Sequence, residues 1–138
     1  MGLDQYAYAA FERGERRRYW ANAKINKKTG QFQSPYKLPH ELGYWRKHRS
    51  LQDWMVNLWK SKGELYPNTD VDPNWGSTFN GVELELEWDD IQKLEDDIKN
   101  FMGFSENCVY REYDLQFCLD AKEQIFLYRK RVFYYPSW

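Results

Sequence analysis

The sequence lacks any long apolar run, any glycine-rich phosphate loop and any convincing disulfide pair. No stretch approaches the ~18 apolar residues that a bilayer-spanning helix needs, and no charged start with an apolar continuation indicates a secretion signal. The 8 glycines are scattered outside any strand–loop–helix context, which argues against the usual nucleotide-binding folds. Cys108 and Cys118 lie near each other at the edge of a predicted helix, which favours two free thiols in a reducing compartment. We therefore expect a cytoplasmic protein without membrane association.

Aromatic side chains, in contrast, are abundant. Of the 138 residues, 19% are aromatic, including 7 Trp and 11 Tyr, while 42% are hydrophobic and 30% are charged. This balance is typical of a globular domain, and folding at this length removes roughly 70% of the unfolded surface from water. No repeat or long linker divides residues 1–138, so we expect a single domain. Its core must contain many rings, and their buried N–H and O–H groups need hydrogen-bond partners.

The net charge of −1 conceals an uneven distribution. Residues 1–63 hold 13 Lys/Arg against 5 Asp/Glu, whereas residues 64–138 hold 7 against 16. In one interpretation, the basic and acidic halves fold against each other and their charges pair or stay solvated. In the other, one face remains basic enough to bind nucleic acid or an acidic partner.

Apolar periodicity predicts an α+β fold with a small, mostly antiparallel sheet of about three strands packed against about three helices. Alternation predicts strands at 3–11, 82–86 and 132–135; helical spacing predicts helices at 40–61, 90–102 and 114–129. Pro39 suits the first turn of the first helix, and Asp89 with Gln92 resembles a capping box for the second. Residues 13–39 are basic and contain glycine and proline, which predicts a loop or arm around a short element at 19–25.

This arm is the strongest candidate binding site in the sequence. Guanidinium groups pair with phosphates and exposed rings stack on bases, so a mixture of the two is typical of single-stranded nucleic-acid binding. Two observations weaken the interpretation, because the pI is only about 6.1 and the rings could instead belong to the core. The candidate residues, including those on the outer face of the predicted helix 40–61, are Arg13, Arg16, Arg17, Arg18, Tyr19, Trp20, Lys24, Lys27, Lys28, Arg46, Lys47 and Arg49.

Metal-binding patterns are weak. His40 and His48 would lie about two turns apart on one helix face, roughly 12 Å along its axis, so they cannot share a metal ion and we expect structural or solvent-facing roles. Asp70, Asp72 and Asn74 have the spacing of a calcium loop, but the required glycine comes one place late and the final glutamate is missing. A turn in which these side chains bind nearby backbone is the simpler interpretation.

Enzyme signatures are also missing. Glu83, Glu85 and Glu87 alternate along one predicted strand, which is typical of a solvated face rather than a paired-carboxylate site. We therefore assign no catalytic residue, no cofactor and no metal ligand. An unrecognised pocket near Tyr6, Tyr44, Arg46 and Glu85 is the remaining enzyme hypothesis.

Four segments give the chain a resemblance to a known group. They are Met1–Tyr6 (MGLDQY), Tyr44–Lys47 (YWRK) followed by Trp54, Val82–Leu86 (VELEL), and Phe133–Trp138 (FYYPSW). In this order they resemble a family of small bacteriophage proteins that is common among marine phages. The resemblance implies a setting, the cytoplasm of an infected bacterium, rather than a mechanism. The chain departs from many members at Gln52, where they have His, and at 103–107, where they are richer in Gly and Phe.

Together these patterns favour a phage accessory protein that binds a macromolecule of the host or phage, with a protein partner preferred. Nucleic-acid binding through residues 13–28 is the first alternative, and an enzyme with a pocket near Tyr44 and Arg46 is the second. Self-association through the oppositely charged halves is a further possibility.

Overall fold

The fold is described from a computed structural model, which covers residues 2–72, 74 and 76–138. Its elements are β1 (Asp4–Ala10), α1 (Glu15–Ala21), β2 (Lys24–Ile25), β3 (Phe32–Gln33), β4 (His40–Arg46), α2 (Arg49–Ser61), β5 (Leu84–Leu86), α3 (Trp88–Lys99), α4 (Arg111–Phe126) and β6 (Arg131–Ser137). Four helices and two antiparallel sheets make this an α+β fold, as the periodicity predicts. None of the described helices has the length and hydropathy that a bilayer crossing requires.

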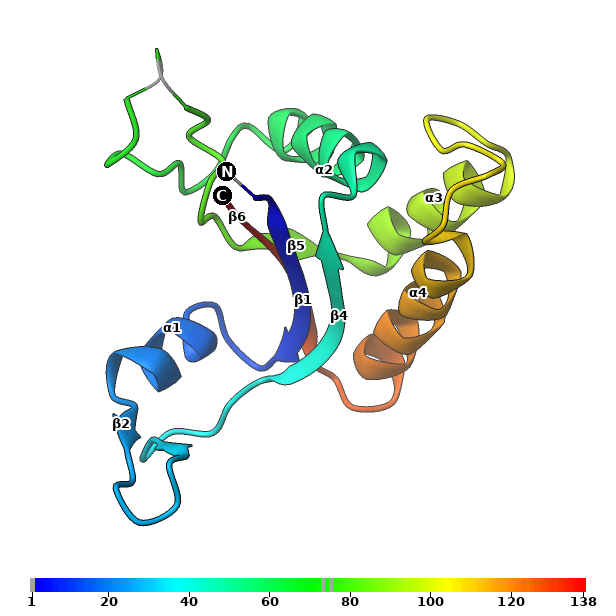
Figure 1. Ribbon diagram of the computed structural model, residues 1–138. Helices are drawn as coiled ribbons and strands as arrows, with labels where there is room; N and C mark the ends of the chain where they lie inside the picture. Colours follow the sequence, from blue (N-terminus) through cyan, green and yellow to red (C-terminus); the bar gives the residue numbers. More distant parts are fainter. Residues whose placement is uncertain (1, 73, 75) are drawn as a thin grey trace.

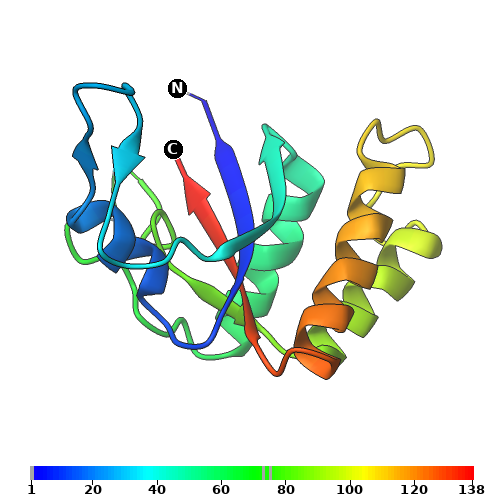
Figure 2. The ribbon, with the colours of Figure 1, turned by 90° about the horizontal axis from the view of Figure 1, so that it is seen from below.

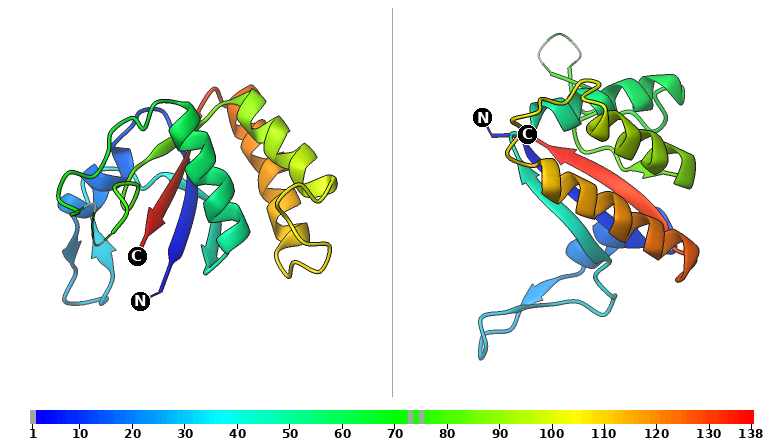
Figure 3. Two further views of the ribbon diagram at one scale, coloured as in Figure 1. Left: turned by 90° about the horizontal axis from the view of Figure 1, so that it is seen from above. Right: turned by 90° about the vertical axis from the view of Figure 1, so that its right-hand side faces the viewer.

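The main sheet has the strand order β4-β1-β6-β5, and each neighbouring pair is antiparallel. Strand β1, near the start of the chain, therefore lies inside the sheet beside β6, near its end (Figure 1). Helices α2, α3 and α4 lie on one side of the sheet, and α1 with the small β2–β3 sheet lies on the other (Figure 2). The β2–β3 hairpin projects away from the rest of the chain (Figure 3).

Both faces of the sheet carry aromatic side chains, which explains why so many are needed. On the helix side, Trp45 and Tyr134 belong to a large buried cluster that also contains residues from α2, α3 and α4. On the other side, Tyr8 and Phe133 form a smaller cluster against which Tyr6 packs. Successive residues of a strand point to opposite faces, so adjacent positions of β1 and β6 supply both clusters.

The predicted helix at 40–61 is wrong in its first part, which is strand β4. Residues 40–46 pair with β1, with Gln5 opposite Trp45 and Tyr6 opposite Tyr44. The Trp45 ring lies over Gly43, where an added Cβ would be 2.5 Å from the ring, so this glycine makes room for the indole. The backbone then turns at Lys47, where φ is 56°, and α2 begins at Arg49.

This correction separates the two histidines. His40 lies at the exposed start of β4, whereas His48 is buried between β4 and α2, so they do not share a helix face. The sequence pattern predicted the wrong element because the apolar positions from 42 to 45 fit both the helical period and the strand period. Pairing with β1 decides in favour of the strand.

The remaining predicted elements are present with shifted ends. The strands predicted at 3–11, 82–86 and 132–135 are β1, β5 and β6, and the helices predicted at 90–102 and 114–129 are α3 and α4. The capping box of α3 is formed by Glu87 and Asp90, not by Asp89 and Gln92. The arm predicted at 13–39 is more regular than expected, because it contains α1 and the β2–β3 hairpin.

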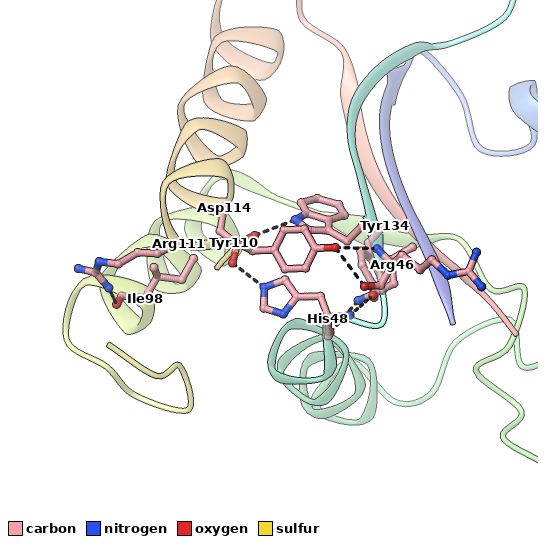
Figure 4. A network of polar contacts seen from close by, with 9 residues as sticks. Arg46, His48, Ile98, Tyr110, Arg111, Asp114 and Tyr134 are labelled. Carbon is pink, nitrogen blue, oxygen red and sulfur yellow. Dashed lines mark hydrogen bonds and ion pairs between the residues drawn. The ribbon is translucent and has the colours of Figure 1, made fainter. Parts of the chain in front are cut away.

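Asp114 in the first turn of α4 joins this helix to β4 and α2. Its Oδ1 accepts a hydrogen bond from Trp45 Nε1 at 2.7 Å, and its Oδ2 lies 2.6 Å from His48 Nε2 (Figure 4). The residues are 1%, 0% and 4% exposed, so all three polar groups depend on one another instead of on water.

A second buried chain of hydrogen bonds continues from the backbone of His48. Gln5 accepts a bond from the His48 amide and donates from Nε2 to the His48 carbonyl and to the Tyr134 hydroxyl. The Tyr134 hydroxyl donates in turn to Gln52 Oε1 at 2.5 Å. Burial raises the pKa of Tyr134, which keeps this hydroxyl protonated as a donor.

The outer edge of β4 is covered by the start of α4. The Tyr110 hydroxyl donates to the Arg46 carbonyl at 3.0 Å, and the Tyr113 hydroxyl accepts the Tyr44 amide at 2.9 Å. Unpaired strand edges invite association with other chains, and these two hydroxyls occupy part of that edge.

We expect Trp45→Phe to lower the free energy of unfolding by about 2–3 kcal/mol, because it removes a donor from a buried carboxylate as well as some volume. Trp54→Phe is the control, since Trp54 also donates to a carboxylate, that of Asp97, in a less buried position. Its loss should be about 1 kcal/mol in urea titrations. Equal losses for the two variants would contradict the importance of the Asp114 contact.

Candidate nucleic-acid interface

Glu83, the residue before β5, forms hydrogen bonds with the residues that precede α1. Gly14 adopts φ 89°, a conformation that favours glycine, and its amide donates to Glu83 Oε1 at 3.0 Å. The Tyr8 hydroxyl donates to Glu83 Oε2 at 2.5 Å, and the Arg13 guanidinium donates to the Glu83 carbonyl oxygen. Glu83 is thus a structural acceptor, not the freely solvated carboxylate expected from the alternating pattern.

Tyr8 remains a hydrogen-bond donor in this arrangement. Burial raises the pKa of its hydroxyl, and the neighbouring Glu83 carboxylate raises it further. The Tyr8 hydroxyl therefore keeps its proton at physiological pH and donates it in the hydrogen bond to Glu83. This contact fixes the position at which the chain leaves β1 and enters α1.

Two arginines place their guanidinium groups over aromatic rings on the α1 side of the sheet. The guanidinium carbon of Arg16 lies 4.7 Å from the ring centre of Tyr6 and 5.2 Å from that of Tyr135. That of Arg13 lies 4.2 Å from the ring centre of Tyr66 and 5.3 Å from that of Phe133. Cations over aromatic faces are attracted by the ring quadrupole, which explains how α1 packs although none of its residues is buried.

An open groove of about 910 Å³ runs between α1 and residues 66–70. Its lining combines cations and rings: Arg13, Arg16, Arg17, Trp20, Tyr66 and Tyr135. Glu83 and Asp70 also line it, and the Glu83 carboxylate is already occupied by the donors of Tyr8 and Gly14.

The structure brings only part of the predicted site together. Arg18 stacks on Tyr36, outside the lining, and Tyr19 lies edge-on to Trp20 at 5.0 Å. The other predicted basic residues lie elsewhere: Lys24, Lys27 and Lys28 on the β2–β3 hairpin, Arg46 and Lys47 at the end of β4, and Arg49 at the start of α2.

The arginines of α1 are not neutralised by the acidic half of the chain. Among the described residues, ion pairs within 4.0 Å join the two halves only at Lys62–Asp90 and at His48–Asp114. The other described pairs lie within one half, and none includes a cation of residues 13–28. Among the residues that the structure describes, pairing between the halves is therefore limited, and the cations of residues 13–28 form no ion pair within 4.0 Å.

Sequence reasoning missed the wall of the groove opposite α1. Tyr66, which has φ 55°, lies in the connection between α2 and β5, and Tyr135 lies in β6. Neither is near residues 13–28 in the chain. The antiparallel pairing of β6 with β1 places Tyr135 there, and Tyr66 is placed by its contact with the Arg13 guanidinium. The high tyrosine content was the one sequence feature that could have indicated further rings at this site.

The predicted enzyme pocket is not assembled. Tyr44 and Glu85 lie on β4 and β5, the opposite edges of the sheet, with two strands and about 14 Å between them. Tyr6 packs against Tyr44 with ring centres 5.2 Å apart. The Tyr44 hydroxyl donates to Asp4, which raises the pKa of Tyr44. Tyr6 and Tyr44 thus pack against each other at one edge of the sheet, and Glu85 lies apart from them at the other edge.

The acidic loop has the local hydrogen bonds of a turn. Asp72 Oδ1 accepts the amide of Asn74 at 2.9 Å, and Asn68 Oδ1 accepts that of Asp70 at 3.0 Å. Pro73 and Trp75, which belong to the same predicted turn, lie outside the described residues.

Comparisons of the chain with models of known protein families, with curated proteins and with solved structures find no match. The groove must therefore be interpreted from its own chemistry.

We expect Arg16→Met to lower the free energy of unfolding by about 1 kcal/mol, because the cation that packs on three tyrosine rings is lost while an unbranched side chain is kept. Arg17→Met is the control at the next position, since Arg17 is exposed and should change stability by less than about 0.5 kcal/mol. Urea titration measures both, and equal effects would show that the rings do not hold Arg16.

Proposed function

We propose that the protein is a phage accessory protein that binds single-stranded nucleic acid in the groove between α1 and residues 66–70. The observation that supports this most is the convergence of three arginines on a groove that also contains Trp20 and Tyr66, while none of the three forms an ion pair within 4.0 Å in the described part of the chain. The family resemblance supports the setting, the cytoplasm of an infected bacterium.

The arginines suit a phosphate ligand. The guanidinium groups of Arg13 and Arg16 are held over aromatic rings, and one Arg13 N–H donates to the Glu83 carbonyl. The other guanidinium N–H groups are donors for phosphate oxygens. Arg17 is exposed and free to reach the backbone of a bound strand. Phosphate contacts of this kind supply most of the affinity of sequence-independent binding.

The rings favour nucleic acid over the acidic protein partner. Trp20 is 43% exposed on α1 and Tyr66 is 64% exposed on the facing segment, so both present apolar surface to the groove. Stacking of a base on such a ring contributes about 1–3 kcal/mol, and it requires bases that are not already paired. An acidic peptide would use the same cations but would have no comparable use for both rings.

The phosphate contacts are tested by fluorescence anisotropy with a labelled 12-nucleotide oligothymidylate over a salt series. Arg17→Ala should weaken binding several-fold and reduce the magnitude of the slope of log affinity against log salt by about 0.7, the value for one single-strand phosphate. Arg18→Ala is the matched control, because it removes the same charge one residue away from the groove lining. Equal effects of the two variants would contradict binding in this groove.

The contribution of the bases is tested with Tyr66→Ala. This variant should bind the oligothymidylate about ten-fold more weakly, because about 1–3 kcal/mol of stacking is lost, while Tyr66→Phe should bind as the parent does. An abasic oligomer of the same length should bind weakly to all three proteins. If the abasic oligomer binds as well as the oligothymidylate, the groove recognises only negative charge, and the acidic protein partner becomes the better proposal.

A further inference from the structure

Three groups of metal-binding type meet on the helix side of the sheet, opposite the groove. His48 precedes α2, Cys108 lies in the connection between α3 and α4, and Asp114 is in the first turn of α4. One ligand atom from each lies within 4.8 Å of the other two. No sequence motif indicates this set, because its members are separated by up to 66 residues and have no motif spacing.

From this convergence we infer that His48, Cys108 and Asp114 form a binding site for a zinc ion. Zinc takes imidazole nitrogen at about 2.0 Å, thiolate sulfur at about 2.3 Å and carboxylate oxygen at about 2.0–2.2 Å in a tetrahedral arrangement. Ligand atoms in such a site are about 3.3–3.8 Å apart. The widest of the three separations, at most 4.8 Å, must therefore shorten by about 1.3 Å or less, and the His48–Asp114 separation of 2.6 Å must widen by about 0.7 Å; a fourth position is left for water.

The surroundings already orient two of the ligands. Trp45 Nε1 donates to Asp114 Oδ1, which fixes the carboxylate and leaves Oδ2 directed at His48. Tyr110 stacks on the imidazole of His48 with ring centres 4.7 Å apart and planes 17° from parallel. Partners that hold a ligand in this way raise metal affinity, since less freedom is lost on binding.

The charges also balance. On binding, the thiol of Cys108 loses its proton, and His48 Nε2 gives up the proton that it shares with Asp114, so that the imidazole is neutral with its one proton on Nδ1. The hydrogen bond between His48 and Asp114 is then replaced by one bond from each to the metal. One thiolate and one carboxylate then neutralise the two positive charges of zinc, so the buried site carries no net charge. A sulfur ligand beside an imidazole favours zinc over magnesium or calcium, which prefer oxygen.

Access is through Cys108. His48 and Asp114 are 4% and 1% exposed, whereas Cys108 is only partly buried and lies in a connection rather than in a helix. The second cysteine does not compete, because Cys118 is buried in the core of α4 and burial raises the pKa of its thiol to about 12. Cys118 therefore serves as an internal control for the role of Cys108.

The test is titration of the reduced, metal-free full chain with Co²⁺, which reports thiolate ligation by a near-ultraviolet charge-transfer band and tetrahedral geometry by visible absorption. The parent protein and Cys118→Ala should show both bands at one equivalent, and Zn²⁺ should remove them. Cys108→Ser should lose the charge-transfer band and bind at least ten-fold more weakly, while its far-ultraviolet circular dichroism should match that of the parent.

No saturable binding by the parent, or a charge-transfer band that persists in Cys108→Ser, would overturn the proposal. In that case the three groups only stabilise the fold by hydrogen bonding. Oligothymidylate binding in the presence and absence of Zn²⁺ separates this outcome from the function of the groove, since the two sites lie on opposite faces of the sheet (Figure 2).

Discussion

The buried carboxylate of Asp114 is the constraint on which most of the structure depends. A carboxyl group at 1% exposure is tolerated only when its oxygens have hydrogen-bond partners, and here the partners come from two other elements, Trp45 of β4 and His48 ahead of α2. Meeting that requirement fixes the distance of α4 from the sheet and the side of β4 that faces inward. It also fixes the turn at Lys47 that carries the chain from β4 into α2.

The inward orientation of β4 and its neighbours determines the opposite face. Because Trp45 and Tyr134 point toward the helices, the adjacent residues Tyr44 and Tyr135 must point the other way. Rings on an outer face need a cover, and in this chain the cover is a short helix whose arginines pack on them as cations. Some of the basic residues that make the first half positive thus serve to pack on aromatic rings. Among the described residues, only two ion pairs join the basic half to the acidic half.

Local patterns predicted the fold class, three of the four strands of the main sheet and its last two helices, because these segments have one clear period and recognisable ends. They failed at residues 40–46, where two periods fit and the pairing partner is far away in sequence. They located the arginines of the groove but not Tyr66 or Tyr135, and they did not connect His48 with Cys108 and Asp114. Each failure concerns contacts between residues distant in the chain, which no local pattern encodes.

The pairing of β1 with β6 has a consequence for synthesis. Tyr6 lies opposite Tyr135, so β1 meets its central neighbour only after residues 11–130, between the two strands, have been made. Until then its exposed edge and apolar residues have only β4 as a partner within the sheet. Cooperative folding of the sheet therefore requires β6, and the side of β1 that pairs with β6 stays unpaired during translation until β6 has been made.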